Sequence, residues 1–539
     1  MNEERKPVLI VGAGPVGLLI ANGLAANNVP FEIVDRKPGP STESKGLAVN
    51  ISSQIAFELC GLTDTIGGHG CKIKRLDVHW NGHRFSSINF TYLATDKNYL
   101  ITQPQWVTEH ELIGALEKRG CLVRWSHELV ELEQLDGGVA TQLKTQGDNL
   151  SEQYEYVIGC DGKYSKVRSY IEPNSETSQY NMYFALGDFQ LEKHIPRDTV
   201  QYQVFGDGFY ILVPISDELT RVVVKYNGTP PDRPIRNEDI IDYVNHYSGT
   251  TLINRAPDWI SRAPFYNSVS DKMQNGQLFI AGDAAHLFSP IGGTGMNTGF
   301  QDAINLLWRL VYVYHGHADR SLLDYYETER VPANRSGMIA ADTNTKNISD
   351  VNNAEEFIHT IAPTMSNRSN LRSTLPAAIS GFAYALDHID GFAGKTGQYD
   401  TALCDYILRH ETDRIQPRQF RHTLLIHNPG LDKDYLNNVV ERCQSYGFVN
   451  VLIVDPDAKS SVHHRRYTNT PQGSVGSTVR NRFQNMFTLV RPDGVIQLEC
   501  DYSDVNLIFK YLNENFTTKC EQLAMKDQSI TDQPVLAQH

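Results

Sequence analysis

The sequence has few features of a membrane, nucleic-acid-binding or disulfide-rich protein. Its 539 residues include eight cysteines, but no two of them form a Cys-x-x-Cys pair, so neither a zinc site nor a dithiol redox site is indicated. The net charge of −14 opposes binding to nucleic acids or anionic membranes, because their phosphates would be repelled. The apolar run Val8 to Val11 is too short for a signal peptide or a membrane span. We therefore expect a cytoplasmic protein without nucleic-acid, membrane or metal partners, long enough for about two to four domains.

The most informative pattern lies between residues 276 and 310. An apolar run that ends at Ala281 predicts a buried strand, and the pair Gly282-Asp283 follows it directly. A loop rich in proline and glycine leads from there into an amphipathic helix that begins between Thr294 and Asn297. Because the first N–H groups of a helix have no partners within it, they favour an anion or a group that develops negative charge. The pattern indicates a site where a flat or negatively charged group approaches the backbone.

The N-terminal residues carry the pattern of a dinucleotide-binding turn. A strand over residues 7–11 leads into Gly12, Gly14 and Gly17, and a second strand ends at Asp35. We expect Gly12 to form the tight turn, Gly14 to let a pyrophosphate approach the backbone, and Gly17 to let the helix pack on the strand. Asp35 follows at the spacing of a carboxylate that accepts hydrogen bonds from an adenosine ribose. This pattern alone does not distinguish FAD from NAD.

A third pattern starts with a strand at Tyr156. The strand is followed by Asp161-Gly162, and the segment ends at Arg168. An Asp-Gly turn that merely ends a strand would give the same local pattern. The segment therefore gains its meaning from its position between the other two.

In this order the three segments resemble the motifs of the FAD-dependent aromatic hydroxylases, the class of p-hydroxybenzoate and phenol hydroxylases. The resemblance covers about residues 5 to 515, and it favours FAD because these flavin enzymes combine the Gly282-Asp283 segment with the N-terminal turn. It implies that FAD is bound by Gly12, Gly14, Pro15, Gly17, Asp35, Arg36, Lys45, Gln105, Asp161, Gly282, Asp283, Pro290, Gly293, Gly295, Met296 and Asn297, with Arg168 in a more indirect role. It also implies that the backbone at Pro290, Gly292 and Gly293 surrounds the flavin ring.

Between these motifs the resemblance is weaker. Lys45 stands where relatives have an arginine, and it can reach a phosphate but lacks the bidentate guanidinium group. Ser52 replaces a second family arginine, which puts a pyrophosphate contact made there in relatives in doubt. Gln105 keeps the family residue and would face the ribityl chain of FAD. Leu47 replaces an aspartate that lies near the substrate in phenol hydroxylase, and this difference favours a bulky polyketide-like or antibiotic-like phenol.

The rest of the chain predicts two further domains. Short aromatic strands between about residues 181 and 228 predict an inserted antiparallel sheet, which in the family closes over the substrate. After about residue 405 the pattern resembles the thioredoxin-like C-terminal domain of longer relatives, with Ser503 as the expected cap of its last helix. The fold class is α/β with an α+β insert. The expected parts are 1–180 and 271–400 for a discontinuous Rossmann-like FAD domain with linker helices, 181–270 for the substrate sheet, 401–515 for the thioredoxin-like domain and 516–539 for a tail.

The resemblance implies a monooxygenase that uses NADPH or NADH and O2 to hydroxylate a phenolic or polyketide-like substrate through a flavin C4a-hydroperoxide. His286 is either a base or part of the local structure, and its position favours local structure. Baeyer–Villiger oxygenation, epoxidation and ring cleavage on the same fold remain alternatives, whereas the segment typical of flavin halogenases is not seen. An FAD-binding protein without enzyme activity is the alternative of a different class. The C-terminal domain is expected to give structural support or to form a homodimer contact.

Overall fold

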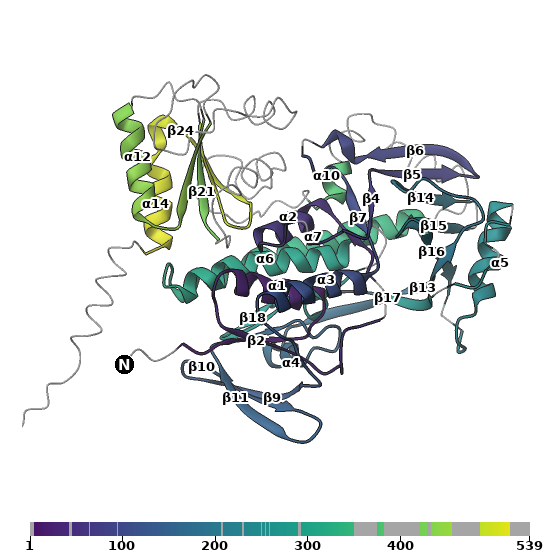
Figure 1. Cartoon of the computed structure of the whole chain (residues 1–539), viewed down its shortest axis with the longest axis horizontal. Coiled ribbons are helices and arrows are strands. Elements are labelled where there is room, and N and C mark those ends of the chain that lie inside the picture. Colours follow the sequence, from purple (N-terminus) through teal and green to yellow (C-terminus); the bar gives the residue numbers. More distant parts are fainter. Residues whose placement is uncertain are drawn as a thin grey trace, which may run out of the picture. The chain divides into compact units, whose positions relative to one another are not determined.

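The computed structural model describes residues 5–42, 46–63, 65–93, 95–205, 208–228, 231–249, 251–253, 255–257, 259–288, 293–349, 375–381, 420–427, 433–454 and 486–517. It is a mixed α/β structure with several sheets (Figure 1). Residues 1–304 and 330–384 form one compact unit, and residues 305–329 and 385–539 form a second. Among the described residues, no helix combines the length and the apolar character needed to cross a membrane.

A six-stranded sheet in the order β18-β19-β12-β1-β2-β8 lies at the centre of the first unit. Its strands are β1 (Val8–Val11), β2 (Phe31–Asp35), β8 (Arg124–Trp125), β12 (Tyr156–Gly159), β18 (Gln274–Asn275) and β19 (Leu278–Ile280). The neighbours from β19 to β8 are all parallel, and β1, β12 and β19 are buried throughout, as expected for a parallel sheet covered on both faces. The predicted strand–helix–strand unit at the N-terminus is present, with α1 (Pro15–Ala26) between β1 and β2.

Helices of the first unit connect and cover these strands. They are α2 (Ile51–Leu59), α3 (Gln105–Lys118), α4 (Lys166–Ile171), α5 (Asn237–Ser248), α10 (Leu375–Ile379) and parts of α6 (Thr294–Tyr314) and α7 (Asp324–Ser349). Helices α1 and α3 lie side by side (Figure 1). Their contact is closed by the buried Asn22, whose amide nitrogen donates to the carbonyl of Leu112 at 3.0 Å.

The predicted antiparallel strands belong to a sheet that is larger than the sequence suggested and that contains one parallel pairing. It has eight strands in the order β20-β17-β13-β16-β15-β14-β5-β6. These are β5 (Arg75–Trp80), β6 (His83–Asn89), β13 (Ser175–Gln190), β14 (Thr199–Val204), β15 (Phe209–Pro214), β16 (Leu219–Asn227), β17 (Trp259–Ser270) and β20 (His286–Leu287). Helix α5 packs on one face beside β13 and β16 (Figure 1), and Tyr210, Leu212, Val222 and Val224 point into the core that they share.

Two small sheets complete the first unit. One has the order β11-β10-β9 and the other β3-β7-β4. Their strands are β3 (Ala48–Val49), β4 (Cys71–Ile73), β7 (Leu100–Thr102), β9 (Glu128–Leu135), β10 (Gly138–Lys144) and β11 (Asn149–Tyr154). The hydroxyl of Thr102 in β7 donates to the carbonyl of Pro214 at 2.5 Å, which ties the second of these sheets to the end of β15.

The second unit contains a four-stranded sheet in the order β22-β21-β23-β24. The strands of this sheet are β21 (His422–His427), β22 (Val449–Val454), β23 (Met486–Val490) and β24 (Ile496–Asp501). The unit also contains the helices α12 (Lys433–Ser445) and α14 (Asn506–Asn515). Strands β21 and β22 are parallel, and β23 and β24 are antiparallel neighbours. Ser503 is not the cap of the last helix, because a short 3-10 turn (Tyr502–Asp504) moves the N-cap to Val505.

Candidate functional site

The carboxyl ends of four parallel strands meet at one edge of the central sheet. Val11 pairs with Val34 on one side and with Gly159 on the other, and Gly159 pairs with Ile280. The residues that follow these strands are the three segments singled out in the sequence. In open parallel sheets, ligands bind outside the carboxyl ends of the strands, where neighbouring connections run in opposite directions. The edge beside β1 and β12 is such a place, because β2 lies on the other side of β1.

The N-terminal turn has two crowded glycines and an open one. A Cβ atom on Gly12, which has φ +108°, would lie 2.4 Å from the carbonyl oxygen of Cys160. A Cβ atom on Gly17 would lie 2.0 Å from the carbonyl oxygen of Gly12. At Gly14, the N-cap of α1, a Cβ atom would meet none of the described residues within 4 Å, and Pro15 is the first helical residue. The backbone at Gly14 is therefore accessible to a ligand.

Asp35 lies at the end of β2 and is half-buried. Its carboxylate accepts the backbone N–H of Ala13 at 2.8 Å and that of Lys37 at 2.9 Å. These bonds join the carboxylate to the Gly-rich turn, and each oxygen keeps a second lone pair for a ligand. The neighbouring Arg36 is exposed.

Asp161 begins the segment after β12. Its Oδ2 accepts the backbone N–H of Lys166 at 2.6 Å, whereas its Oδ1 is buried and has no hydrogen-bond partner among the described residues. Burial raises the pKa of Asp161, although hydrogen bonds from the start of α4 oppose the rise. Arg168 donates to the carbonyl of Ala284 at 2.8 Å and to the carbonyl of Lys163. Arg168 therefore links this segment to the turn after β19.

Buried polar groups stabilise the turn after β19. Gly282 has φ +62°, a backbone conformation that favours glycine, and its N–H donates to Oδ2 of Asp302 at 3.1 Å. Asp283, the next residue, is exposed. His286 is buried, its Nε2 lies 2.7 Å from Asp302 Oδ2, and its ring stacks on Phe288. Within this structure His286 belongs to the support of the turn.

Helix α6, which begins at Thr294, is the next helix along the chain. Gly293 precedes it with φ +65°, and Thr294, Gly295 and Met296 form its first positions, where backbone N–H groups have no helical acceptor. The hydroxyl oxygen of Thr294 is buried without a partner among the described residues. The side chain of Asn297 is buried and makes four hydrogen bonds within the protein, so it acts as a tie rather than as an open ligand group.

Gln105 lies at the start of α3, close to the same helix end. Its Oε1 accepts the backbone N–H of Gly46 at 2.9 Å, and its Nε2 donates to Glu109 at 2.8 Å. A Cβ atom on Gly46 would lie 2.7 Å from Gln105 Oε1 and 3.3 Å from the sulfur of Met296. The backbone at Gly46 and the side chains of Gln105 and Met296 therefore meet at one point. Lys45, Pro290 and Gly292 lie outside the described residues.

The sequence reasoning missed the polar groups that support these segments. Asn50 and Ser53 bind Asn297, and Arg330 binds Asp302 through its Nε at 2.8 Å. One available signal was the presence of Asp302 within a helix that also carries the apolar residues Phe300, Ala303 and Ile304. A buried carboxylate requires nearby donors, but the sequence does not say which residues supply them.

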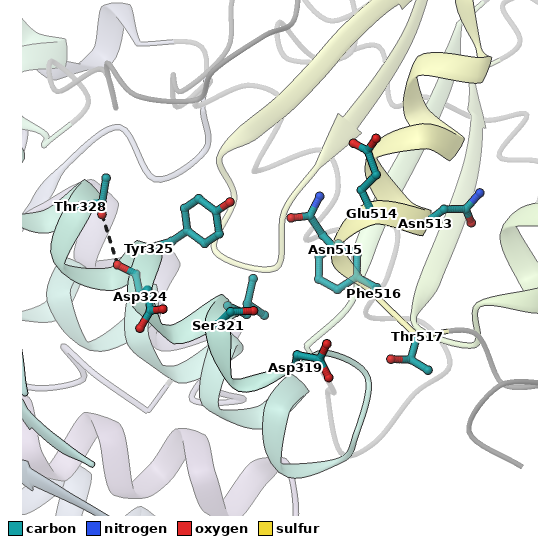
Figure 2. Close-up of a pocket in the computed structure, with 11 residues that line it drawn as sticks. Asp319, Ser321, Asp324, Tyr325, Thr328, Asn513, Glu514, Asn515, Phe516 and Thr517 are labelled. Atoms are coloured by element: carbon teal, nitrogen blue, oxygen red, sulfur yellow. Dashed lines mark hydrogen bonds between the residues drawn. The ribbon is translucent and has the colours of Figure 1, made fainter. Parts of the chain in front are cut away.

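A separate cavity of about 510 Å³ lies in the second unit. Its lining includes Asp319, Asp324 and Tyr325 on one side and Glu514 and Phe516 on the other (Figure 2). None of the residues predicted to bind FAD contributes to it. It is therefore not the site described above.

The residues at the sheet edge fit a dinucleotide with a flavin. The open backbone at Gly14 suits a pyrophosphate, and the carboxylate of Asp35 suits a ribose. Within the part of the chain that the structure describes, Oδ1 of Asp161 and the hydroxyl of Thr294 have no hydrogen-bond partner, and together with the start of α6 they leave buried polar groups available to a bound molecule.

Known proteins resemble this chain in sequence and in fold. The chain is 31% identical over 342 residues to 6-methylpretetramide 4-monooxygenase of Streptomyces rimosus, across 63% of this chain and 61% of that protein. It is 30% identical over 339 residues to rifampicin monooxygenase of Streptomyces venezuelae, across 60% of this chain and 68% of that protein. The solved structure of an anhydrotetracycline hydroxylase from Streptomyces rimosus has a TM-score of 0.71 at 22% identity, across 93% of this chain and 96% of that one.

The alignment to the first of these relatives thus spans less than two thirds of that protein's length. A model of the family described as FAD binding domain matches residues 5–339, more than half of the residues. The chain therefore belongs to the FAD binding domain family.

Proposed function

We propose that this chain is an NAD(P)H- and O2-dependent FAD monooxygenase that hydroxylates a phenolic or polyketide-like aromatic compound. The observation that supports it most is the meeting of the Gly12–Gly17 turn, Asp161 and Gly282-Asp283 at one sheet edge, beside the start of α6. Relatives named for the oxygenation of 6-methylpretetramide and rifampicin support the substrate class.

In this proposal the predicted residues bind different parts of FAD. Gly14 and Pro15 would lie along the pyrophosphate and Asp35 would bind the adenosine ribose, while Gln105 and Asp283 would bind the ribityl chain. Gly12 and Gly17 act through the close packing that they permit. The remaining predicted contacts are Arg36, Lys45, Asp161, Gly282, Pro290, Gly292, Gly293, Gly295, Met296 and the backbone of Asn297. When bound and reduced, FAD supplies the oxygen-activating chemistry that amino-acid side chains do not provide.

The start of α6 would provide the electrostatic part of the mechanism. Its first N–H groups, at Thr294, Gly295 and Met296, have no helical acceptors and carry the positive end of the helix dipole. Donors that are fixed before the reaction stabilise negative charge without the cost of reorganisation. Since the side chain of Asn297 is held by four hydrogen bonds, this helix end would be fixed before a substrate binds.

The eight-stranded sheet would supply the substrate surface. One face is covered by α5, and strand alternation places Leu186, Ile211 and Val223 on the other face, where they are register neighbours. An apolar surface of this kind suits an aromatic ring system. The side chain of Leu47 cannot accept a proton, so residue 47 does not deprotonate the phenol, in contrast to the aspartate expected in phenol hydroxylase.

We also propose a division of the chain into three domains. We propose a discontinuous Rossmann-like FAD domain in 1–180 and 271–400 and a substrate sheet in 181–270. For 401–515 we propose a thioredoxin-like domain, supported by a four-stranded sheet with one parallel and two antiparallel pairings and by helices α12 and α14. A cytoplasmic location and a homodimer are proposed with it, and cell fractionation and light scattering test them.

Anaerobic stopped-flow reduction of the purified FAD-loaded protein tests the function. NADPH and NADH are compared with and without a panel of phenols and aromatic polyketides, and products are identified after O2 is admitted. We expect one compound class to accelerate reduction strongly and to gain one oxygen atom on an aromatic carbon. A lactone or an epoxide as the product would replace hydroxylation by Baeyer–Villiger oxygenation or epoxidation. Failure to bind FAD would overturn the proposal.

A further inference from the structure

Asp302 has a hydrogen-bond partner at every lone-pair position of its carboxylate. Oδ2 accepts the backbone N–H of Gly282 at 3.1 Å and faces Nε2 of His286 at 2.7 Å. Oδ1 accepts Nε of Arg330 at 2.8 Å and the amide nitrogen of Asn334 at 3.3 Å. A carboxylate has about four acceptor positions, so this set leaves none unused.

The partners of Asp302 come from separate parts of the first unit. Gly282 belongs to the turn after β19, and His286 lies in β20, where it pairs with Val269 of β17 at the edge of the large sheet. Arg330 and Asn334 are part of α7. Asp302 itself is in α6, eight residues after the first helical residue Thr294. One carboxylate therefore connects a loop, a sheet edge and two helices.

The carboxylate is ionised although it is completely buried. Burial by itself would raise the pKa of Asp302, but its interactions with His286 and Arg330 outweigh burial and hold the pKa below its usual value. A buried charge is stable only while its partners remain in place. Movement of the Gly282 turn or of α6 away from the carboxylate would therefore be costly.

We propose that Asp302 is a positioning residue that fixes the Gly282-Asp283 turn relative to the first turn of α6. The inference rests on the proposed FAD site, because these two segments would hold the flavin end of the cofactor. A straight helix transmits the position of Asp302 to Thr294 over about 12 Å, at 1.5 Å per residue. Asp302 does not touch the cofactor in this proposal, and it acts through Gly282 and the helix.

The test compares Asp302→Asn with Asp188→Asn. Asp188 is also a buried carboxylate in the first unit, and it receives a bidentate hydrogen bond from Arg221 at 2.7 and 2.9 Å, but it lies in the large sheet outside every predicted FAD segment. The Kd for FAD is measured by fluorescence titration of the apoprotein, and the apoprotein Tm is measured in parallel. We expect both variants to lower the Tm, but only Asp302→Asn to raise the Kd, by at least about tenfold.

A second pair of variants keeps the test valid if Asp302→Asn does not fold. His286→Gln retains a nitrogen donor at the position of Nε2, and His286→Leu removes it. We expect the Gln variant to keep FAD affinity within about threefold of wild type and the Leu variant to lose about tenfold or more.

The outcomes separate this inference from the proposed function. Wild-type protein that does not bind FAD would overturn the proposed function itself. Wild-type binding, together with an unchanged Kd in Asp302→Asn or an equal loss in Asp188→Asn, would leave the FAD site intact and overturn the positioning role. Equal FAD affinity in both His286 variants would also overturn the positioning role of Asp302.

Discussion

The side-chain oxygen of Asn297 accepts the backbone N–H of Asn50 at 2.9 Å, across 247 residues of sequence. The same oxygen accepts the hydroxyl of Ser53 at 2.7 Å, and the amide nitrogen donates to the carbonyls of Ala48 and Gly293. One side chain thus joins the start of α6 to β3, to Asn50 and to the first turn of α2. These bonds organise a helix end that the proposed function assigns to the flavin.

Replacing Asn297 by leucine should therefore cost more than the loss of an ordinary buried amide. All four bonds disappear and buried backbone groups lose partners, so we expect the free energy of unfolding of the apoprotein to fall by about 2–4 kcal/mol. Urea unfolding measures this change. Asn27→Leu is the control, because Asn27 is also buried and donates locally to the carbonyl of Gly23 at 2.8 Å. Equal losses in the two variants would contradict the tie between α6 and residues 48–53.

Gly14 and Gly17 predict opposite effects of the same substitution. Gly17→Ala places a methyl group 2.0 Å from the carbonyl oxygen of Gly12, so we expect it to unfold the N-terminal part of the chain or to displace α1. Gly14→Ala meets nothing within 4 Å, so the apoprotein should keep its Tm within about 2 °C. If a pyrophosphate lies against Gly14, the same methyl group should weaken FAD binding by about tenfold or more. Calorimetry of the apoprotein tests the predicted stabilities, and FAD titration tests the predicted loss of affinity. Unchanged FAD affinity in Gly14→Ala would argue against this pyrophosphate position.

The elements that the sequence predicts well are those with local causes. The strand–helix–strand unit around Gly12 and the strand before Gly282 follow from apolar runs and from glycines that only tight turns require. Parallel pairing then brings Asp161 to the same edge, because crossover connections return each strand in the same direction.

Other features depend on contacts that no local pattern contains. The partner of Asn297 is 247 residues away, and Asp302 meets Gly282, His286 and Arg330 only after the chain has closed. The Ser503 cap failed for a different reason, since a 3-10 turn ahead of α14 competes with the capped helix start. The sequence therefore indicated which segments meet at the edge of the central sheet, but not which side chains support them.

Two consecutive residues of β15 should separate substrate binding from stability. Leu212 points into the core shared with α5, whereas Ile211 points to the opposite face of the sheet. We expect Leu212→Ala to lower the free energy of unfolding by about 2–5 kcal/mol without changing the substrate KM. Ile211→Ala should raise KM or change the substrate range, as measured by steady-state NADPH oxidation across the substrate panel. If Leu212→Ala changed KM and Ile211→Ala did not, the substrate would lie on the α5 side of the sheet, which would contradict this prediction.

The second unit contains a buried network of charges around Glu329. Its carboxylate contacts Arg309 at 2.7 Å and Arg491 at 2.7 and 3.0 Å, and it accepts the amide nitrogen of Asn305 at 2.8 Å. Arg491 is also paired with Asp493. Burial by itself would raise the pKa of Glu329, but the two arginines outweigh burial and lower it to about 2.

The stability of this unit should therefore depend on pH through Glu329. A depressed carboxylate pKa gives stability that is complete above the unfolded value of about 4.3 and is lost as the pH falls toward 2, and a shift of this size corresponds to about 3 kcal/mol. Glu329→Gln removes a buried carboxylate that both arginines share and leaves Arg491 with Asp493 alone, so we expect a loss of about 3–5 kcal/mol at pH 7 that shrinks as the pH falls below 4. Urea unfolding followed by tryptophan fluorescence measures the stability of wild type and of Glu329→Gln at each pH, since Trp308 is buried in this unit. Glu514→Gln is the control, because Glu514 is exposed and lies 3.8 Å from Lys510, and it should change stability by less than about 0.5 kcal/mol at either pH. A Glu329→Gln effect that stays constant from pH 7 to pH 3 would mean that the carboxylate is not ionised in the folded protein.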